Sequence, residues 1–130
     1  MKRFLLLMLV VVGLQSCTND TKALNGEWTL VELKGAALGD KAPTLTIDLA
    51  NMKANGSDGC NTFMGTIEKA TESELVFGSL ASSLMLCEDM ATADVFNTAM
   101  KEVKNYQIKN EQLLLSNAQG EVLLTFSKNK

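Results

Sequence analysis

The sequence predicts a small α+β domain in which strands dominate and a single helix interrupts them. Short alternations of apolar and polar residues, typical of half-buried strands, recur between residues 26 and 78. An apolar period of 3.6 residues then extends from Asp89 to Val103 and predicts one amphipathic helix. Three more alternating segments, separated by turn residues, follow to the C-terminus. This order of elements indicates strands, one helix and an antiparallel meander.

The first 16 residues have the organisation of a bacterial export signal. Lys2 and Arg3 provide a positive start, and residues 4–12 form an apolar run too short for the roughly 20 residues that span a bilayer. Leu14-Gln15-Ser16-Cys17 then resembles the lipobox of bacterial lipoproteins. That resemblance implies cleavage before Cys17 and a diacylglycerol group on its thiol. We therefore expect an exported protein that a lipid anchors to the cell envelope.

Cleavage divides the expected protein into three parts. These are a signal peptide (residues 1–16), a lipidated tether (17–23) and one domain (24–130). Several acyl chains anchor a protein firmly, because a single chain binds a membrane only marginally and reversibly. Thr18 follows the cysteine, so the aspartate that retains some lipoproteins in the inner membrane is absent, which favours the outer membrane.

Charge and composition argue against several kinds of partner and chemistry. Loss of Lys2 and Arg3 changes the formal net charge from −3 to −5, and no cluster of basic residues offers a nucleic-acid footprint. The chain contains no histidine, so serine or cysteine nucleophiles lack their usual base and a metal site lacks its commonest nitrogen ligand. We expect no catalytic residue, no metal, no cofactor and a monomer, and we assign Ser82 and Ser83 structural roles.

Cys60 and Cys87 remain as a pair once Cys17 carries lipid. In an exported protein one disulfide is the simplest interpretation, and it would close a loop of 28 residues. The chain-entropy model gives such a loop about 3.5 kcal/mol of stabilisation. A second interpretation is that both thiols are free and buried. A third interpretation is redox or metal chemistry, although 26 residues separate the cysteines and two thiols alone do not complete a zinc site.

The glycine-rich stretch from Gly56 to Gly65 surrounds the first of these cysteines. Gly59 is expected to have a positive φ or to pack tightly, and Gly65 predicts a bulge or a close backbone approach inside a strand. Asn61 can hydrogen-bond its own backbone or a ligand, and we favour the local turn. Trp28, the only tryptophan, is expected to anchor the core, with ligand stacking as the alternative.

Alternation and turn residues place the individual elements. Asp89 is expected to cap the helix. The expected strands cover residues 28–33, 44–49, 52–55, 62–67, 75–78, 105–109, 112–116 and 122–127.

Three motifs, in order, resemble those of a known family. Residues 24–30 (LNGEWTL) resemble L-x-G-T-W-x-L, with Glu27 in place of threonine. Residues 56–65 (GSDGCNTFMG) agree with G-x-x-G-C-N-x-F-x-G. Residues 82–87 (SSLMLC) resemble T-T-x-M-A-C, with Leu86 in place of alanine. Over about residues 24–127 the chain is similar to the META domain of the HslJ-type heat-shock lipoproteins.

The resemblance implies a strongly curved antiparallel sheet or small barrel-like fold packed around one helix. It also implies an exported protein linked to heat or antibiotic stress, and it carries no catalytic residue over to this chain. We expect a non-catalytic binding or interaction module, with Gly59, Asn61, Phe63 and Trp28 as its candidate binding or structural residues. The alternative is a carrier or inhibitor that holds a small apolar ligand or a protein partner in the cavity of the sheet.

Overall fold

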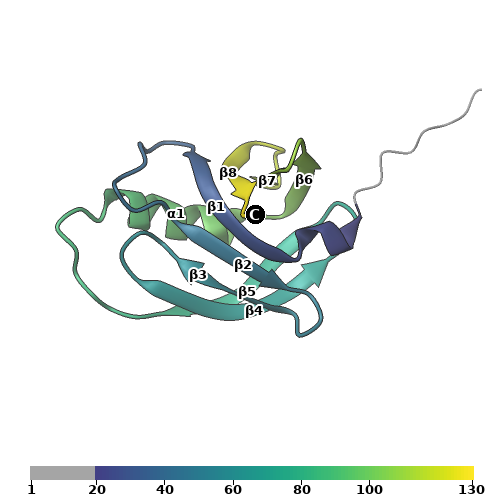
Figure 1. The fold of residues 1–130 in the computed structure, drawn as a ribbon, viewed down its shortest axis with the longest axis horizontal. Helices are drawn as coiled ribbons and strands as arrows, with labels where there is room; N and C mark the ends of the chain where they lie inside the picture. The colour runs from purple at the N-terminus through teal and green to yellow at the C-terminus, as the bar shows by residue number, and fades with distance from the viewer. Residues whose placement is uncertain (1–19) are drawn as a thin grey trace, which may run out of the picture.

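The computed structural model describes residues 20–130, which form one curved sheet and one helix (Figure 1). The predicted signal peptide, the lipobox and Cys17 lie outside the described residues. The strands are β1 (Gly26–Leu33), β2 (Thr44–Asp48), β3 (Lys53–Ser57), β4 (Thr62–Ala70), β5 (Leu75–Ser82), β6 (Asn105–Lys109), β7 (Gln112–Ser116) and β8 (Val122–Lys128), and the helix is α1 (Ala91–Glu102).

All eight strands belong to one antiparallel sheet with the order β5-β4-β3-β2-β1-β8-β7-β6. Every pair joins strands that follow each other in sequence except β1 and β8, which unite the two halves of the chain. The first residues of the two edge strands, β5 and β6, lie side by side. The N–H of Leu75, the first residue of β5, donates to the carbonyl oxygen of Lys104, just before β6, at 3.1 Å. The sheet is therefore a strongly curved half-barrel, which confirms the predicted fold class.

Helix α1 packs on the concave side of the sheet through its apolar face. Phe96 and Met100 are fully buried, and the Phe96 ring lies 5.8 Å from that of Phe63 and 6.4 Å from that of Phe126, measured between centroids. The helix covers Ala91–Glu102, within the predicted 89–103, and its N-cap residue is Met90, so the prediction of Asp89 as the cap is wrong. Asp89 stands just before the helix and accepts a hydrogen bond from the Ala91 N–H at 2.9 Å, which satisfies one amide of the first turn.

The concave side of the sheet is filled with large side chains. Tyr106 is buried, and its hydroxyl donates to the Thr71 carbonyl oxygen at 2.7 Å. Burial raises the pKa of Tyr106, because the phenolate would lose its hydration. The other large and fully buried residues are Leu24, Trp28, Leu30, Leu45, Leu75, Phe96, Met100, Leu113, Leu115, Leu124 and Phe126. Side chains thus occupy the space that a ligand inside the sheet would need.

Three strands extend by two or more residues beyond the C-terminal ends that alternation predicted. β3 continues through Gly56 to Ser57, β4 continues to Ala70, and β5 continues to Ser82. Neighbouring strands supply the hydrogen bonds there, so pairing persists although the apolar alternation has ended. In particular, β5 pairs with β4 as far as Ser82, opposite Phe63.

The folded part also begins earlier than the predicted domain start at Leu24. A short 3₁₀ turn covers Thr21–Leu24, and the Asp20 side chain caps it by accepting from the Lys22 N–H at 3.0 Å. Figure 1 shows this turn at one end of the long axis, whereas the loop between β5 and α1 extends at the other end. Among the described residues no helix is both long and apolar enough to cross a membrane.

Candidate interaction site at the disulfide loop

The turn between β3 and β4 is built around a buried carboxylate. Asp58 is only 1% exposed, and its Oδ1 accepts hydrogen bonds from the N–H groups of Cys60 at 2.9 Å and Asn61 at 2.7 Å. Its Oδ2 accepts from Nδ2 of Asn97, on α1, at 2.8 Å. The carboxylate therefore fixes the shape of the turn and joins it to the helix. The spacing of Asp58 before the two amides is a turn signal that our sequence analysis missed, whereas Asn97 carries no local signal.

The glycines of this stretch behave as predicted. Gly59 has a φ of 99°, and a Cβ there would lie 3.0 Å from the Lys41 carbonyl oxygen. Gly65 combines both expected features. The register between β4 and β5 shifts immediately after it, and a Cβ would lie only 2.3 Å from the Ser79 carbonyl oxygen.

Asn61 ties this turn to a segment far along the chain. Its Oδ1 accepts from the Met85 N–H at 2.7 Å and from Oγ of Ser83 at 3.0 Å, and its Nδ2 donates to the Met85 carbonyl oxygen at 3.1 Å. The predicted bond to its own backbone is therefore wrong, and the alternative of a free amide for a ligand has no support either. An amide side chain offers one acceptor and one donor group, so Asn61 pairs with Met85 as a neighbouring strand would.

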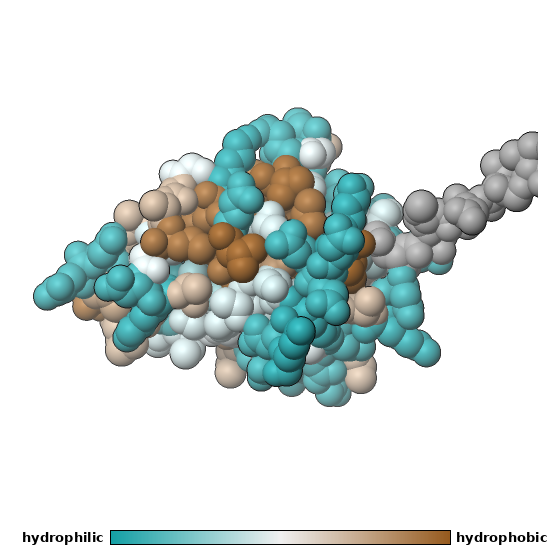
Figure 2. Space-filling model, turned by 45° about the horizontal axis from the view of Figure 1, so that its top comes forward, coloured by the Kyte–Doolittle hydropathy of each residue, from teal (hydrophilic) through white to brown (hydrophobic). Residues whose placement is uncertain are grey.

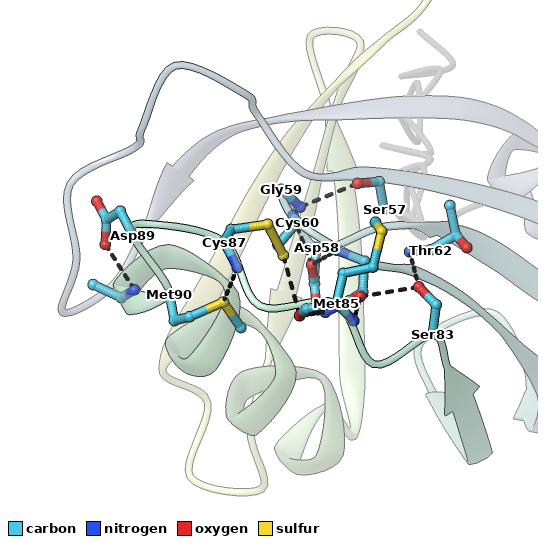
Figure 3. The surroundings of a disulfide bond; sticks show 12 residues. Ser57, Asp58, Gly59, Cys60, Thr62, Ser83, Met85, Cys87, Asp89 and Met90 are labelled. Atoms are coloured by element: carbon cyan, nitrogen blue, oxygen red, sulfur yellow. Dashed lines mark hydrogen bonds between the residues drawn. A yellow bond between two sulfur atoms is a disulfide. The ribbon is translucent and has the colours of Figure 1, made fainter.

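The predicted disulfide between Cys60 and Cys87 is confirmed. The S–S distance is 2.00 Å and the two Cα atoms are 6.0 Å apart. Two adjacent residues, Cys60 and Asn61, thus hold the returning segment at two points, one covalent and one through hydrogen bonds. Figure 3 shows these attachments around Met85, Cys87 and the bridge.

The segment Ser83–Cys87, which we call the apolar loop, exposes three consecutive apolar side chains. The exposed fractions are 94% for Leu84, 57% for Met85 and 93% for Leu86. Backbone contacts alternate along the loop. The N–H groups of Ser83 and Met85 are bonded to the domain, whereas the backbone groups of Leu84 and Leu86 have no hydrogen-bond partner among residues 20–130. The exposed fractions show that the side chains of Leu84 and Leu86 extend away from the domain that holds the loop.

Trp28 and Phe63, the other candidate residues, belong to the core. Trp28 is 1% exposed, its Nε1 donates to the Leu24 carbonyl oxygen at 2.9 Å, and Nζ of Lys128 lies 4.4 Å from its ring centroid. Phe63 is 4% exposed and packs against Phe96. The core-anchor prediction for Trp28 is confirmed, and ligand stacking is not supported because the ring is buried.

Comparison with protein families decides what the chain is. The model of the META domain matches residues 21–130, which include the whole sheet, the helix and the disulfide. The chain belongs to the META domain family. The resemblance read from the three motifs is thus confirmed, and an HslJ-type protein, a narrower name, is consistent with it. A search of curated proteins gave no match.

Solved structures share the fold of this META domain. An NMR structure of a protein from Burkholderia xenovorans has a TM-score of 0.65 at 23% identity, covering 85% of this chain and 86% of that one. Another NMR structure has a TM-score of 0.66 at 23% identity, covering 84% and 94%. A crystal structure of a DUF4847 family protein from Bacteroides vulgatus has a TM-score of 0.58 at 17% identity, covering 82% and 94%. At these identities the likeness concerns the fold alone.

The META domain has other exposed apolar side chains, but they are dispersed over its strands. Met64, on β4, is 67% exposed, and Val31 and Val122 are 44% and 39% exposed. Figure 2 shows hydrophobic residues gathered over the middle of the face in view, with hydrophilic side chains around and across them. Partly exposed apolar residues are normal on protein surfaces. Within residues 20–130, the apolar loop is the place where three consecutive large apolar side chains are exposed, two of them by more than nine tenths.

A cleft of about 430 Å³ adjoins the disulfide of the META domain. It is open, and four charged residues are among those that line it, namely Asp40, Lys41, Glu88 and Asp89. In the part of the chain that the structure describes, no three histidine, cysteine, aspartate or glutamate side chains come together as a metal site would require. The polar lining suits water and a charged rim better than an apolar ligand.

Replacing Asp58 by alanine is expected to lower the unfolding free energy by about 3 kcal/mol. The change removes the acceptor of two backbone N–H groups and of Asn97, and buried donors without acceptors cost about 1–3 kcal/mol each. Asp58→Asn keeps an oxygen for the two amides and should cost less than about 1.5 kcal/mol. Urea unfolding followed by circular dichroism measures both variants. Equal losses for the two would contradict the hydrogen-bonding role of the carboxylate.

Proposed function

We propose that this META domain protein is a non-catalytic, lipid-anchored interaction module of the bacterial cell envelope that binds a protein partner through its apolar loop. The observation that carries the proposal is a hydrophobic segment that is both exposed and held in place. Leu84 and Leu86 expose more than nine tenths of their side chains, so the fold has little need of leucine at either position. Exposed apolar patches on soluble domains usually mark binding sites.

The attachments of the loop favour binding further. The loop is fixed by the disulfide of Cys87, by the hydrogen bonds of Asn61 to Met85, and by the bond of the Ser83 N–H to the Thr62 carbonyl oxygen at 3.1 Å. Ordering a flexible segment on binding costs conformational entropy. A segment that is already restrained avoids much of that cost, which raises its affinity for a partner.

The position of the loop indicates a protein partner rather than the membrane that holds the lipid. The apolar loop lies at the end of the long axis opposite the turn at Thr21, where the chain leads toward Cys17 (Figure 1). A lipid on Cys17 would hold the first end at the bilayer and leave the loop facing away from it. The acidic residues Glu88 and Asp89, which follow the loop, also disfavour contact with anionic headgroups.

The second candidate, a carrier with its ligand inside the curved sheet, has less support. The concave side is filled by buried side chains, among them Trp28, Phe96 and Tyr106.

The proposal has two further parts. A role in the stress response is inferred from the HslJ-type resemblance alone, and a location in the outer membrane is inferred from Thr18. The heat shock and the membrane fractionation in the experiments below test these two parts.

Photo-crosslinking in living cells tests the interaction. Leu86 is replaced by p-benzoylphenylalanine, and the matched control carries the same residue at Lys109, an exposed position at the end of β6. We expect a discrete protein adduct from position 86 and none from position 109, increasing after heat shock. Adducts at both positions, or at neither, would overturn binding through the loop.

The same cultures test the anchor. The adduct should fractionate with outer membranes, and the chain should incorporate radiolabelled palmitate. Cys17→Ala should abolish the label. A palmitate label that persists in this variant, or a chain found wholly in the soluble fraction, would contradict the lipid attachment.

A further inference from the structure

We propose that the apolar loop occupies the substrate cleft of an endopeptidase with apolar specificity pockets, so that the protein is a competitive inhibitor of such an enzyme. This inference rests on the proposed function, because it names the class of partner that the loop binds. Endopeptidases bind their substrates as extended segments, which add a strand to the cleft and place alternate side chains in pockets.

One edge of the loop backbone is bonded to the domain and the other edge is unpaired, as binding in such a cleft requires. In an extended segment, successive residues direct their N–H and C=O groups to opposite edges. Both groups of Met85 are taken by the side chain of Asn61. Those of Leu84 and Leu86 have no partner among residues 20–130, so the opposite edge of the loop is available to an enzyme.

The side chains fit the same arrangement. Leu84 and Leu86 are separated by one residue, which in an extended chain places them on one side at a spacing of roughly 6.5–7 Å. They are 94% and 93% exposed, so each stands clear of the body on nearly all sides. A flat surface or the edge of a sheet would cover only one side of such a leucine. A pocket encloses it, and pockets for alternate side chains are what a substrate cleft provides.

The attachments of the loop explain why it would inhibit rather than be digested. Consider the peptide bond between Leu86 and Cys87. On its N-terminal side Met85 is held by Asn61, and on its C-terminal side Cys87 is held by Cys60. Cys60 and Asn61 are adjacent, and the carboxylate of Asp58 binds both of their amides. If an enzyme cut this bond, neither half could leave the cleft, because both remain attached to one rigid turn.

Inhibition assays test the inference directly. Residues 20–130 hold every strand, the helix and the disulfide, so this domain is purified oxidised and titrated into chymotrypsin and subtilisin with a chromogenic peptide substrate. We expect competitive inhibition of at least one enzyme at roughly micromolar Ki. Leu86→Asp should raise Ki about 100-fold, because it removes a buried anchor and brings a charge into the pocket.

Two further variants separate the loop from the rest of the molecule. Met64→Ser removes another exposed apolar side chain, 67% exposed on β4, and should leave Ki unchanged. Asn61→Ala keeps both leucines and the disulfide but releases Met85. It should turn the loop from inhibitor into substrate, seen as cleavage between residues 84 and 87 by mass spectrometry. Circular dichroism verifies that each variant retains the native fold.

Several outcomes would overturn the inference. These are no inhibition of either enzyme at roughly 100 µM domain, rapid cleavage of the native loop without inhibition, and equal loss of inhibition in Met64→Ser. Binding to phosphatidylglycerol vesicles that Leu86→Asp abolishes, without inhibition, would assign the loop to lipid instead. An adduct at position 86 with an envelope protein that is not a peptidase would leave the proposed function intact and overturn only its peptidase form.

Discussion

The variant Gly56→Val is expected not to fold. A Cβ at this position would lie 2.0 Å from the carbonyl oxygen and 2.8 Å from the carbonyl carbon of Thr44. Both atoms belong to the backbone of β2, which pairs with β3 at Leu45 opposite Gly56, so no side-chain rotation can relieve the overlap. The two strands would have to separate in the middle of the sheet. We expect a loss of more than about 4 kcal/mol, measured as soluble yield and as the urea midpoint by circular dichroism.

Gly39→Ala is the matched control for this variant. A Cβ at Gly39 would lie 3.7 Å from Oγ1 of Thr92, an ordinary van der Waals contact. This control should therefore change the unfolding free energy by less than about 0.5 kcal/mol. A native urea midpoint for Gly56→Val would contradict the close approach of β2 and β3 at this glycine.

Local pattern predicted the elements of this fold better than their arrangement. Strict alternation at residues 44–48 marks β2, and the 3.6-residue period of Phe96 and Met100 marks α1. The pairing of β1 with β8 is different. It joins Leu30 to Phe126, which are almost the length of the domain apart, and nothing near either residue specifies the other. The curvature of the sheet accordingly came from the family resemblance.

At the candidate site, too, features set by neighbouring residues were predicted, whereas contacts between residues far apart in the sequence were not. The expectation of an exported protein was enough to predict a disulfide between Cys60 and Cys87, which the structure has. The preference of glycine for tight turns was enough to predict the positive φ of Gly59. The role of Asn61 was missed because its partner, Met85, is 24 residues away. A side-chain amide that imitates a strand can be recognised only when the returning backbone is beside it.

The apolar loop was the least predictable part. Three apolar residues next to a cysteine read as core in a sequence, since burial is the usual fate of leucine. Here the backbone groups of Ser83 and Met85 are bonded to the domain and hold the segment at its surface, where Leu84 and Leu86 are almost fully exposed. The bond between Met85 and Asn61 joins residues 24 positions apart, and sequence alone does not reveal it.

Removing the disulfide is expected to lower the unfolding free energy by about 3.5 kcal/mol, because the unfolded chain loses the closure of a loop with a sequence separation of 27. Domain stability of about 5–15 kcal/mol can absorb this loss. The double variant Cys60→Ser/Cys87→Ser should therefore fold and melt about 10–15 °C lower, by thermal circular dichroism on residues 20–130. Reduction of the native domain with dithiothreitol should give the same melting temperature.

The double variant also separates the two attachments of the apolar loop. Dithiothreitol should leave its melting temperature unchanged, which makes it the control for reductant effects elsewhere. Asn61 still binds Met85 in this variant, but nothing holds residue 87, so proteolysis after Leu86 should now release the C-terminal side of the cut. We expect faster cleavage of the loop than in the native domain at a temperature where both are folded. If dithiothreitol left the melting temperature of the native domain unchanged, the disulfide would contribute nothing to stability. The proposal that a covalent bond restrains the loop at Cys87 would then be contradicted.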